Sequence, residues 1–182
     1  MTASGSKSLG SIAAGSKEAV ASSEFILRRG GNAVDAAIAG VLASFASEPV
    51  LTGPFGGGFA MVSAGNKETK SYQFFAQTPG LGSPPDSQIN DFNGLICNFG
   101  PTTQTFHIGR GSVAVPLMLP GLLTLHKEQG TLAWSQLVAP AVGVAQRGVS
   151  LSRQMSSIFE ILEPILVHTP QGQALFAPGG TL

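Results

Sequence analysis

The most regular hydrophobic pattern in the chain lies between Asn32 and Glu48. Apolar residues recur there at helical spacing, and the positions between them are mostly alanine and glycine. Asn32 follows the helix-ending pair Gly30-Gly31 and can accept a backbone N–H as an N-cap, while Asp35 falls in the first turn, where its charge suits the helix dipole. A helix with so little polar surface is expected to be buried. The regularly spaced residues are Val34, Ala37, Ile38, Val41, Leu42 and Phe45.

Similar patterns predict helices on both sides of this one. Ser16 is the expected N-cap of a preceding helix that ends at Arg28 and Arg29, whose charges suit a helix C-terminus. Pro140 and Pro164 fall inside two later helices and are expected to break or kink them, because proline removes a backbone donor and clashes with the preceding turn. These later helices are predicted at Leu117–Gln129, Ala133–Arg147 and Ser152–Val167.

Short apolar segments bounded by glycine, proline and polar residues predict strands. Two of them should form a hairpin around the polar loop Gly65–Lys70, with Phe74 and Phe75 on opposite faces of its second strand. The segment Thr78–Asn93 is rich in proline, glycine and serine and is predicted as a long surface loop. The predicted strands are Gly10–Ala14, Phe59–Ala64, Ser71–Gln77, Leu95–Phe99 and Gly111–Pro116, and the last two are apolar enough for the centre of a sheet.

The run Gly56-Gly57-Gly58 between the buried helix and the first hairpin strand has two interpretations. A phosphate-binding loop would normally be followed by a helix and by Gly-Lys-Ser/Thr, which are absent here. The alternative is a turn where backbone packs closely because no Cβ intervenes. Strands flanked by helices indicate an α/β (α+β) fold.

Charged residues make up only 11% of the 182 residues, and the formal net charge is +0. So few charges suggest that a second polypeptide covers apolar surface, including the helix from Asn32 to Glu48. The absence of a basic excess argues against nucleic acid, and the apolar runs are too short to span a membrane. Met1–Ser8 lacks the apolar core of a signal peptide, which favours a cytoplasmic location, or a periplasmic or secreted one if a signal was trimmed. Cys97, the only cysteine, is expected to be buried.

Several motifs in a fixed order resemble the γ-glutamyltranspeptidase family. They are Ala14-Gly15, the segment Phe25–Ala37, Gly56–Phe59, the segment Gly111–Pro116, and Gly130–Trp134 with Pro140-Ala141. The resemblance implies an αββα N-terminal-nucleophile-hydrolase sandwich, of which this chain supplies part. It also implies a precursor that cuts itself into a heterodimer, in which a new N-terminal threonine attacks a γ-glutamyl or other amide bond, as in glutathione metabolism.

By this resemblance, residues 1–182 form a single domain, a partial large subunit that lacks the nucleophile. The implied partner is the small catalytic subunit from the same precursor, in a hetero- or higher oligomer, and the implied substrate is a small-molecule amide or peptide. No catalytic residue is expected in this chain, and no cofactor or metal is implied. A catalytically silent scaffold or interaction subunit with the family fold is the alternative.

The sequence departs from the family pattern in the second strand of the hairpin. Transpeptidases carry there an arginine that grips the α-carboxylate of the glutamyl donor, and the planar guanidinium suits this task because it binds a carboxylate with two hydrogen bonds. In this chain Phe75 stands in the place of the arginine and Ala76 in that of the following glutamate. A donor of the glutathione type would lose its main anchor.

Four polar residues complete the candidate substrate-binding set with Phe75: Gln77, Gln104, His107 and Arg110. Gln77 belongs to the altered hairpin segment, and Arg110 could supply the missing cation. Gln104 and His107, with Thr105 between them, either bind substrate or satisfy backbone groups of a loop. Asp35 and Glu48 are expected to be structural, and His126 and His168 to be ordinary surface histidines.

Overall fold

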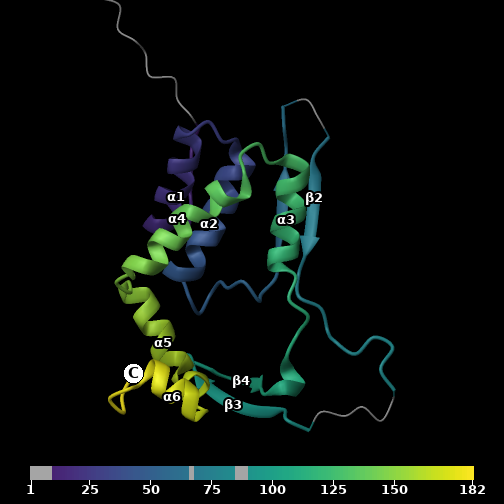
Figure 1. Ribbon diagram of the computed structural model, residues 1–182. Helices are drawn as coiled ribbons and strands as arrows, with labels where there is room; N and C mark the ends of the chain where they lie inside the picture. Colours follow the sequence, from purple (N-terminus) through teal and green to yellow (C-terminus); the bar gives the residue numbers. More distant parts are fainter. Residues whose placement is uncertain (1–9, 66–67, 85–89) are drawn as a thin grey trace, which may run out of the picture. The chain divides into compact units, whose positions relative to one another are not determined.

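The computed structural model describes residues 10–65, 68–84 and 90–182 (Figure 1). The chain divides into two compact units. One contains the described residues up to Phe75 together with Pro116–Val149, and the other contains those of Ala76–Val115 together with Ser150–Leu182.

Four helices build the first unit: α1 (Lys17–Arg28), α2 (Ala33–Ser47), α3 (Met118–Gln129) and α4 (Trp134–Arg147). Both predicted N-caps are confirmed. The Ser16 hydroxyl accepts a hydrogen bond from the Ala19 amide at 3.2 Å. The Asn32 side chain accepts one from the Asp35 amide at 2.9 Å, and the Asp35 carboxylate accepts one from the Asn32 amide at 3.0 Å, which completes a capping box.

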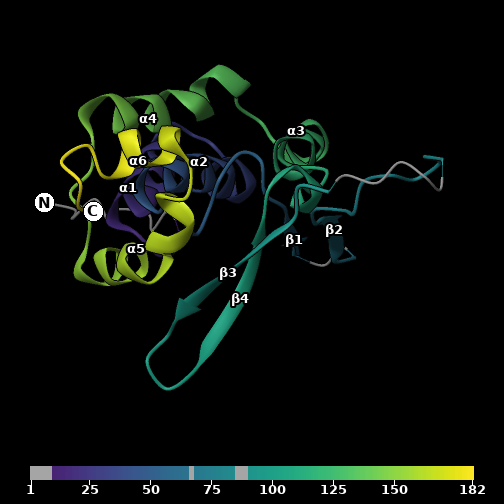
Figure 2. The same cartoon turned by 90° about the horizontal axis from the view of Figure 1, so that it is seen from below.

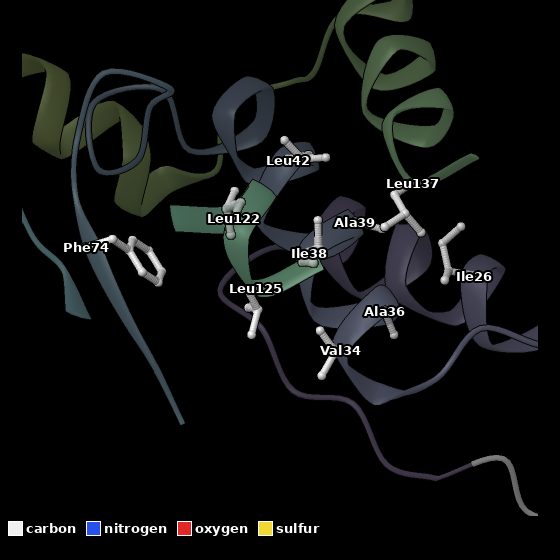
Figure 3. Packing of buried hydrophobic residues seen from close by; sticks show 10 residues of the cluster. All are labelled: Ile26, Val34, Ala36, Ile38, Ala39, Leu42, Phe74, Leu122, Leu125 and Leu137. Carbon is white, nitrogen blue, oxygen red and sulfur yellow. The ribbon is translucent and has the colours of Figure 1, made fainter. Parts of the chain in front are cut away.

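Helix α2 lies at the centre of the first unit, where it contacts α1, α3 and α4. Ten of its fifteen residues are buried, and Ile38 and Ala39 are fully enclosed (Figure 3). Burying a side chain the size of Ile38 contributes about 1.5–3 kcal/mol. The predicted burial is confirmed, and other helices of the same chain supply most of it; coverage of the remaining surface by a second polypeptide stays a prediction.

A two-stranded antiparallel hairpin, β1 (Gly58–Val62) and β2 (Lys70–Phe74), completes the first unit, with Phe59 opposite Gln73. Helix α3 packs against β2. Phe74 is 7% exposed and Phe75 is 56% exposed, so their predicted placement on opposite faces is confirmed.

Glycines allow the close approach of backbone to the Phe74 ring. A Cβ on Gly58 would lie 2.8 Å from a ring carbon of Phe74, and a Cβ on Gly121 of α3 would overlap the same ring. Gly58 ends the glycine-rich run, and this contact supports the close-packing interpretation of that run.

The second unit contains the hairpin β3 (Asn93–Asn98) and β4 (Thr103–Ile108), then α5 (Arg153–Leu166) and α6 (Pro170–Phe176). Helix α5 contacts β3, and α6 lies beside α5 (Figure 2). The rings of Phe159 on α5 and Phe176 on α6 have centroids 6.1 Å apart. The predicted strand near Leu95 is confirmed as β3, although it pairs with one strand only and is not central in a sheet.

Two predicted strands are wrong, and one observed strand was not predicted. The segment Gly111–Pro116 is not a strand: Arg110–Ser112 is a short 3-10 helix, and only Val115 forms a β-bridge. The partner of β3 is β4 (Thr103–Ile108), a polar segment that was expected to be a loop. Gly10–Ala14 is not a strand either, because no described strand pairs with it.

The predicted break at the two internal prolines is wrong, because α4 continues through Pro140 and α5 through Pro164, while the alternative of a kink stays a prediction. Leu137 and Val144 of α4 are buried on either side of Pro140, and this packing outweighs the lost backbone bond. Pro164 lies near the end of α5, where few bonds remain to be lost. The predicted loops Gly65–Lys70 and Thr78–Asn93 lie partly outside the described residues.

A buried carboxylate joins α2 to the turn between α3 and α4. Asp35 is fully buried, and besides the Asn32 amide it accepts hydrogen bonds from the Thr131 amide, at 3.0 Å, and the Thr131 hydroxyl, at 2.5 Å. The Asn32 side chain also donates to the Gln129 carbonyl at 2.6 Å. The expected structural role of Asp35 is therefore confirmed, because its carboxylate links two turns that are far apart in the sequence.

Burial alone would raise the pKa of Asp35. The hydrogen bonds from the Thr131 hydroxyl and from the backbone amides of Asn32, Thr131 and Leu132 outweigh it and hold the pKa below the ordinary value of 3.8. A carboxylate with a lowered folded-state pKa adds stability that is fully present above its unfolded pKa and is lost as pH falls through the folded pKa.

We expect Asp35→Asn to lower the free energy of unfolding at pH 7 by about 1.5–3 kcal/mol, since it replaces charge-assisted hydrogen bonds. The difference from the wild type should shrink as pH falls below 3.8 toward the lowered pKa. Chemical denaturation across this pH range measures both effects, with Glu68→Gln, at an exposed position of the same unit, as the control that should change little. If the difference in the free energy of unfolding stays constant or grows as pH falls, the proposed stabilising role of the Asp35 carboxylate is wrong.

Gly121→Ala should destabilise the first unit by about 1–3 kcal/mol, because the new methyl group overlaps the Phe74 ring inside a packed core. Gly53→Ala is the matched control, because a Cβ there meets nothing within 4 Å. Thermal or urea unfolding compares the two variants, and equal losses would show that the contact between α3 and Phe74 is not tight.

Candidate substrate-binding surfaces

Phe75 directly follows β2 and lies on the outer side of the first hairpin. Its ring stacks on that of Phe59, with centroids 5.5 Å apart and an angle of 19° between the planes. Alternation along the strands places both rings on the face opposite Phe74. The position where the family pattern has an arginine therefore presents an exposed, apolar aromatic pair.

Gln77 belongs to the second unit and is held there by its backbone. Its amide donates to the Val115 carbonyl at 3.2 Å, and the Val115 amide donates to the Gln77 carbonyl at 2.7 Å. The residue is exposed. This bridge uses no side-chain atom of Gln77, so its amide group is not needed for the fold.

Gln104 and His107 both lie on β4, but on opposite faces. Gln104 pairs with Cys97, whose side chain is fully buried as predicted, whereas His107 pairs with Gly94. The His107 ring stacks on Phe92 with centroids 4.4 Å apart and an angle of 11°. Both Gln104 and His107 are exposed. The hairpin therefore does not bring these two candidates to one face.

Arg110 begins the 3-10 helix and is tied to Asp91. Its amide and its side-chain Nε donate to the Asp91 carboxylate at 3.0 and 3.2 Å, and these two hydrogen bonds, the amide's first, lower the pKa of Asp91. The Asn93 side chain donates to the other carboxylate oxygen at 3.0 Å. The Arg110 side chain stays 83% exposed, and an exposed ion pair of this kind holds a side chain only weakly.

Asp91 was not singled out from the sequence. It precedes Arg110 by nineteen residues, and only the pairing of β3 with β4 brings the two together. One signal in the sequence could have drawn attention to Asp91: it comes two residues before Asn93, the first residue of β3, and aspartate and asparagine often hydrogen-bond the backbone of turns.

The remaining candidates have mixed outcomes. His126 is half-buried: its Nε2 lies 2.8 Å from the Leu132 carbonyl oxygen, and its ring meets Trp134 edge-on. The prediction of an ordinary surface histidine is therefore wrong for His126, although His168 is exposed as predicted. The Glu48 carboxylate lies against Gly15 in a groove of about 550 Å³ between residues 10–15, α1 and α2.

Within the described ranges, no three His, Cys, Asp or Glu side chains gather in a way that could hold a metal ion. Within the same ranges, no helix combines the length and the apolar character needed to cross a bilayer.

Comparison with known proteins shows the family to which the chain belongs. The model of the γ-glutamyltranspeptidase family matches residues 19–182, and the chain belongs to that family. Glutathione hydrolase proenzyme 2 of Schizosaccharomyces pombe is 32% identical over 85% of this chain, and the acylase ACY 1 proenzyme of Pseudomonas sp. strain V22 is 28% identical over 85%. The chain spans about a quarter of these relatives, 24% and 28% of their lengths.

A solved structure agrees with the family assignment. The γ-glutamyltranspeptidase of Helicobacter pylori superimposes with a TM-score of 0.74 at 21% identity, covering 96% of this chain and 48% of that one. The predicted α/β (α+β) class, with this chain supplying part of the N-terminal-nucleophile-hydrolase fold, is thereby confirmed.

Proposed function

We propose that this chain is the large-subunit portion of an amidohydrolase or acyltransferase whose acyl donor carries no α-carboxylate at the usual glutamyl position. Membership of the γ-glutamyltranspeptidase family supports the reaction class. The observation that carries the donor preference is the exposed pair of Phe75 and Phe59 where the family pattern has its carboxylate-binding arginine.

In this proposal the chemistry belongs to a threonine at the N-terminus of the second subunit. Its hydroxyl oxygen attacks the amide carbonyl carbon while the terminal amine takes the hydroxyl proton. The C–N bond then breaks, the leaving amine receives that proton, and an acyl ester remains on the threonine. Water or an acceptor amine releases the acyl group in a second step. The large-subunit portion contributes binding and orientation.

Desolvation determines the donor preference. A carboxylate buried against Phe75 and Phe59 without a cation would cost several kcal/mol, whereas an apolar acyl group would gain about 25 cal/mol for each Å² of contact. The names of the relatives fit a family that handles more than one acyl group, since they include an acylase as well as glutathione hydrolases.

The polar candidates have secondary roles in the proposal. Arg110 belongs to the second unit, where an exposed ion pair with Asp91 holds its side chain weakly, and its part as the cation for a donor carboxylate stays a prediction. Gln77 is proposed as a hydrogen-bonding contact of the acyl group. Because Gln104 and His107 lie on opposite faces of β4, we expect only one of them to contact the donor.

A catalytically silent scaffold is the second candidate function. The replacement of an arginine and a glutamate by Phe75 and Ala76 favours it, because a subunit without a substrate needs no donor anchor. Under this alternative the complete protein binds its partner chain but hydrolyses no amide.

A panel of amides with a common leaving group tests the proposal in the complete, processed protein. The wild type should turn over uncharged acyl amides faster than the γ-glutamyl member. Phe75→Arg should raise kcat/KM for the γ-glutamyl member about tenfold or more, since a charge-assisted hydrogen bond contributes about 1.5–3 kcal/mol. Phe75→Leu, which keeps the site apolar, is the control and should not raise it.

Two results would contradict parts of this account. Efficient γ-glutamyl turnover by the wild type, undiminished in Arg110→Ala, would show that neither Phe75 nor Arg110 governs donor choice. Turnover of no amide by a correctly processed protein would favour the silent scaffold.

A further inference from the structure

A groove lies between α1 and α4 on the surface of the first unit. Its volume is about 620 Å³, which falls in the range of small-molecule sites. None of its described lining residues belongs to α2, to the first hairpin or to the candidate substrate-binding set. Most of the lining is apolar or small: Ala21, Phe25, Ala139, Pro140, Gly143 and Val144.

Small side chains leave this groove open. Ala21 of α1 and Ala139 of α4 are exposed and carry only a methyl group, so neither fills the space between the helices. Val144 is 4% exposed and forms part of the floor, and Phe25 is 41% exposed. The Arg29 guanidinium lies over the Phe25 ring, 4.3 Å from its centroid, and this cation–π contact holds the ring in place as an apolar wall.

Arg147, the last residue of α4, brings a positive charge to the groove. A Cβ on Gly143, one turn earlier, would lie 3.0 Å from Nη1 of Arg147. Glycine is a poor helix former, and here it leaves the space that the guanidinium occupies beside the groove. Lys17 and Glu18 also line the groove, and their Nζ and Oε1 atoms are 3.8 Å apart, so these two charges offset each other. Within the described ranges Arg147 makes no ion pair.

We propose that this groove binds a small amphipathic monocarboxylate, that is, a carboxylic acid with an aliphatic or aromatic tail. A guanidinium binds a carboxylate with two hydrogen bonds, and the Arg147 side chain is available for them. The tail lies along the apolar residues and is thereby removed from water. The single positive charge that remains in the groove matches a carboxylate better than a phosphate group, whose charge approaches two.

This inference goes beyond the proposed function. It requires neither a threonine on the second subunit nor the turnover of an amide. An acid that bound at the candidate donor site would depend on Phe75 instead of Arg147. Variants of these two residues therefore separate the two sites.

Calorimetric titration of the complete gene product with octanoate tests the inference, and octanamide, which has the same tail without the charge, is the matched ligand. Arg147→Gln removes the charge from the groove, and Lys127→Gln removes an exposed charge of α3 in the same unit. Ala139→Leu fills part of the groove. Ala145→Leu is its control, at an exposed position of the same helix outside the groove lining.

We expect saturable binding of octanoate by the wild type. Binding should be about tenfold or more weaker for octanamide, and for octanoate with Arg147→Gln, because both changes remove the charge-assisted hydrogen bonds. Ala139→Leu should weaken octanoate binding to a similar degree by occupying the space of the tail. Lys127→Gln and Ala145→Leu should bind octanoate as the wild type does.

Two results would overturn the proposal. One is the lack of saturable octanoate binding by the wild type. The other is octanoate binding that stays unchanged in either Arg147→Gln or Ala139→Leu. If Phe75→Arg then changes the binding, the acid occupies the donor site and not the groove between α1 and α4.

Discussion

The first unit depends on the fully buried carboxylate of Asp35. Its hydrogen bonds with Asn32 and Thr131 join the start of α2 to the turn between α3 and α4. An unpaired charge in this position would be costly, so the two turns have to meet for the unit to fold. Once they meet, α2 is enclosed by α1, α3 and α4, and α3 is placed against the hairpin.

This constraint extends to the candidate site. Gly58 and Gly121 lie so close to the Phe74 ring that Phe74 is fixed on the inner side of β2. Because side chains alternate along a strand, Phe75 must then face outward, onto Phe59. The aromatic pair on which the proposed donor preference rests is thus a consequence of helix packing as well as of local sequence.

The sequence was most informative where local signals suffice. Ser16 and Asn32 predicted the starts of α1 and α2 because an N-cap depends on residues within one turn. Strand β4 and the ion pair of Arg110 with Asp91 could not be predicted in this way, because both depend on the pairing of distant residues. The same pairing places Gln104 and His107 on opposite faces of β4, whereas the sequence had suggested them as members of one substrate-binding set. Helix α6 was not predicted, because its seven residues are too few to show a clear helical pattern of apolar positions.

We propose that these residues form part of the large subunit of a self-cleaving enzyme, and family membership over residues 19–182 is the main support for this proposal. Intact-mass and N-terminal analysis of the complete gene product tests it most directly. The account predicts two chains, the larger containing residues 1–182 and the smaller beginning with threonine. A single uncleaved chain, or a smaller chain that begins with a residue unable to act as a nucleophile, would contradict it.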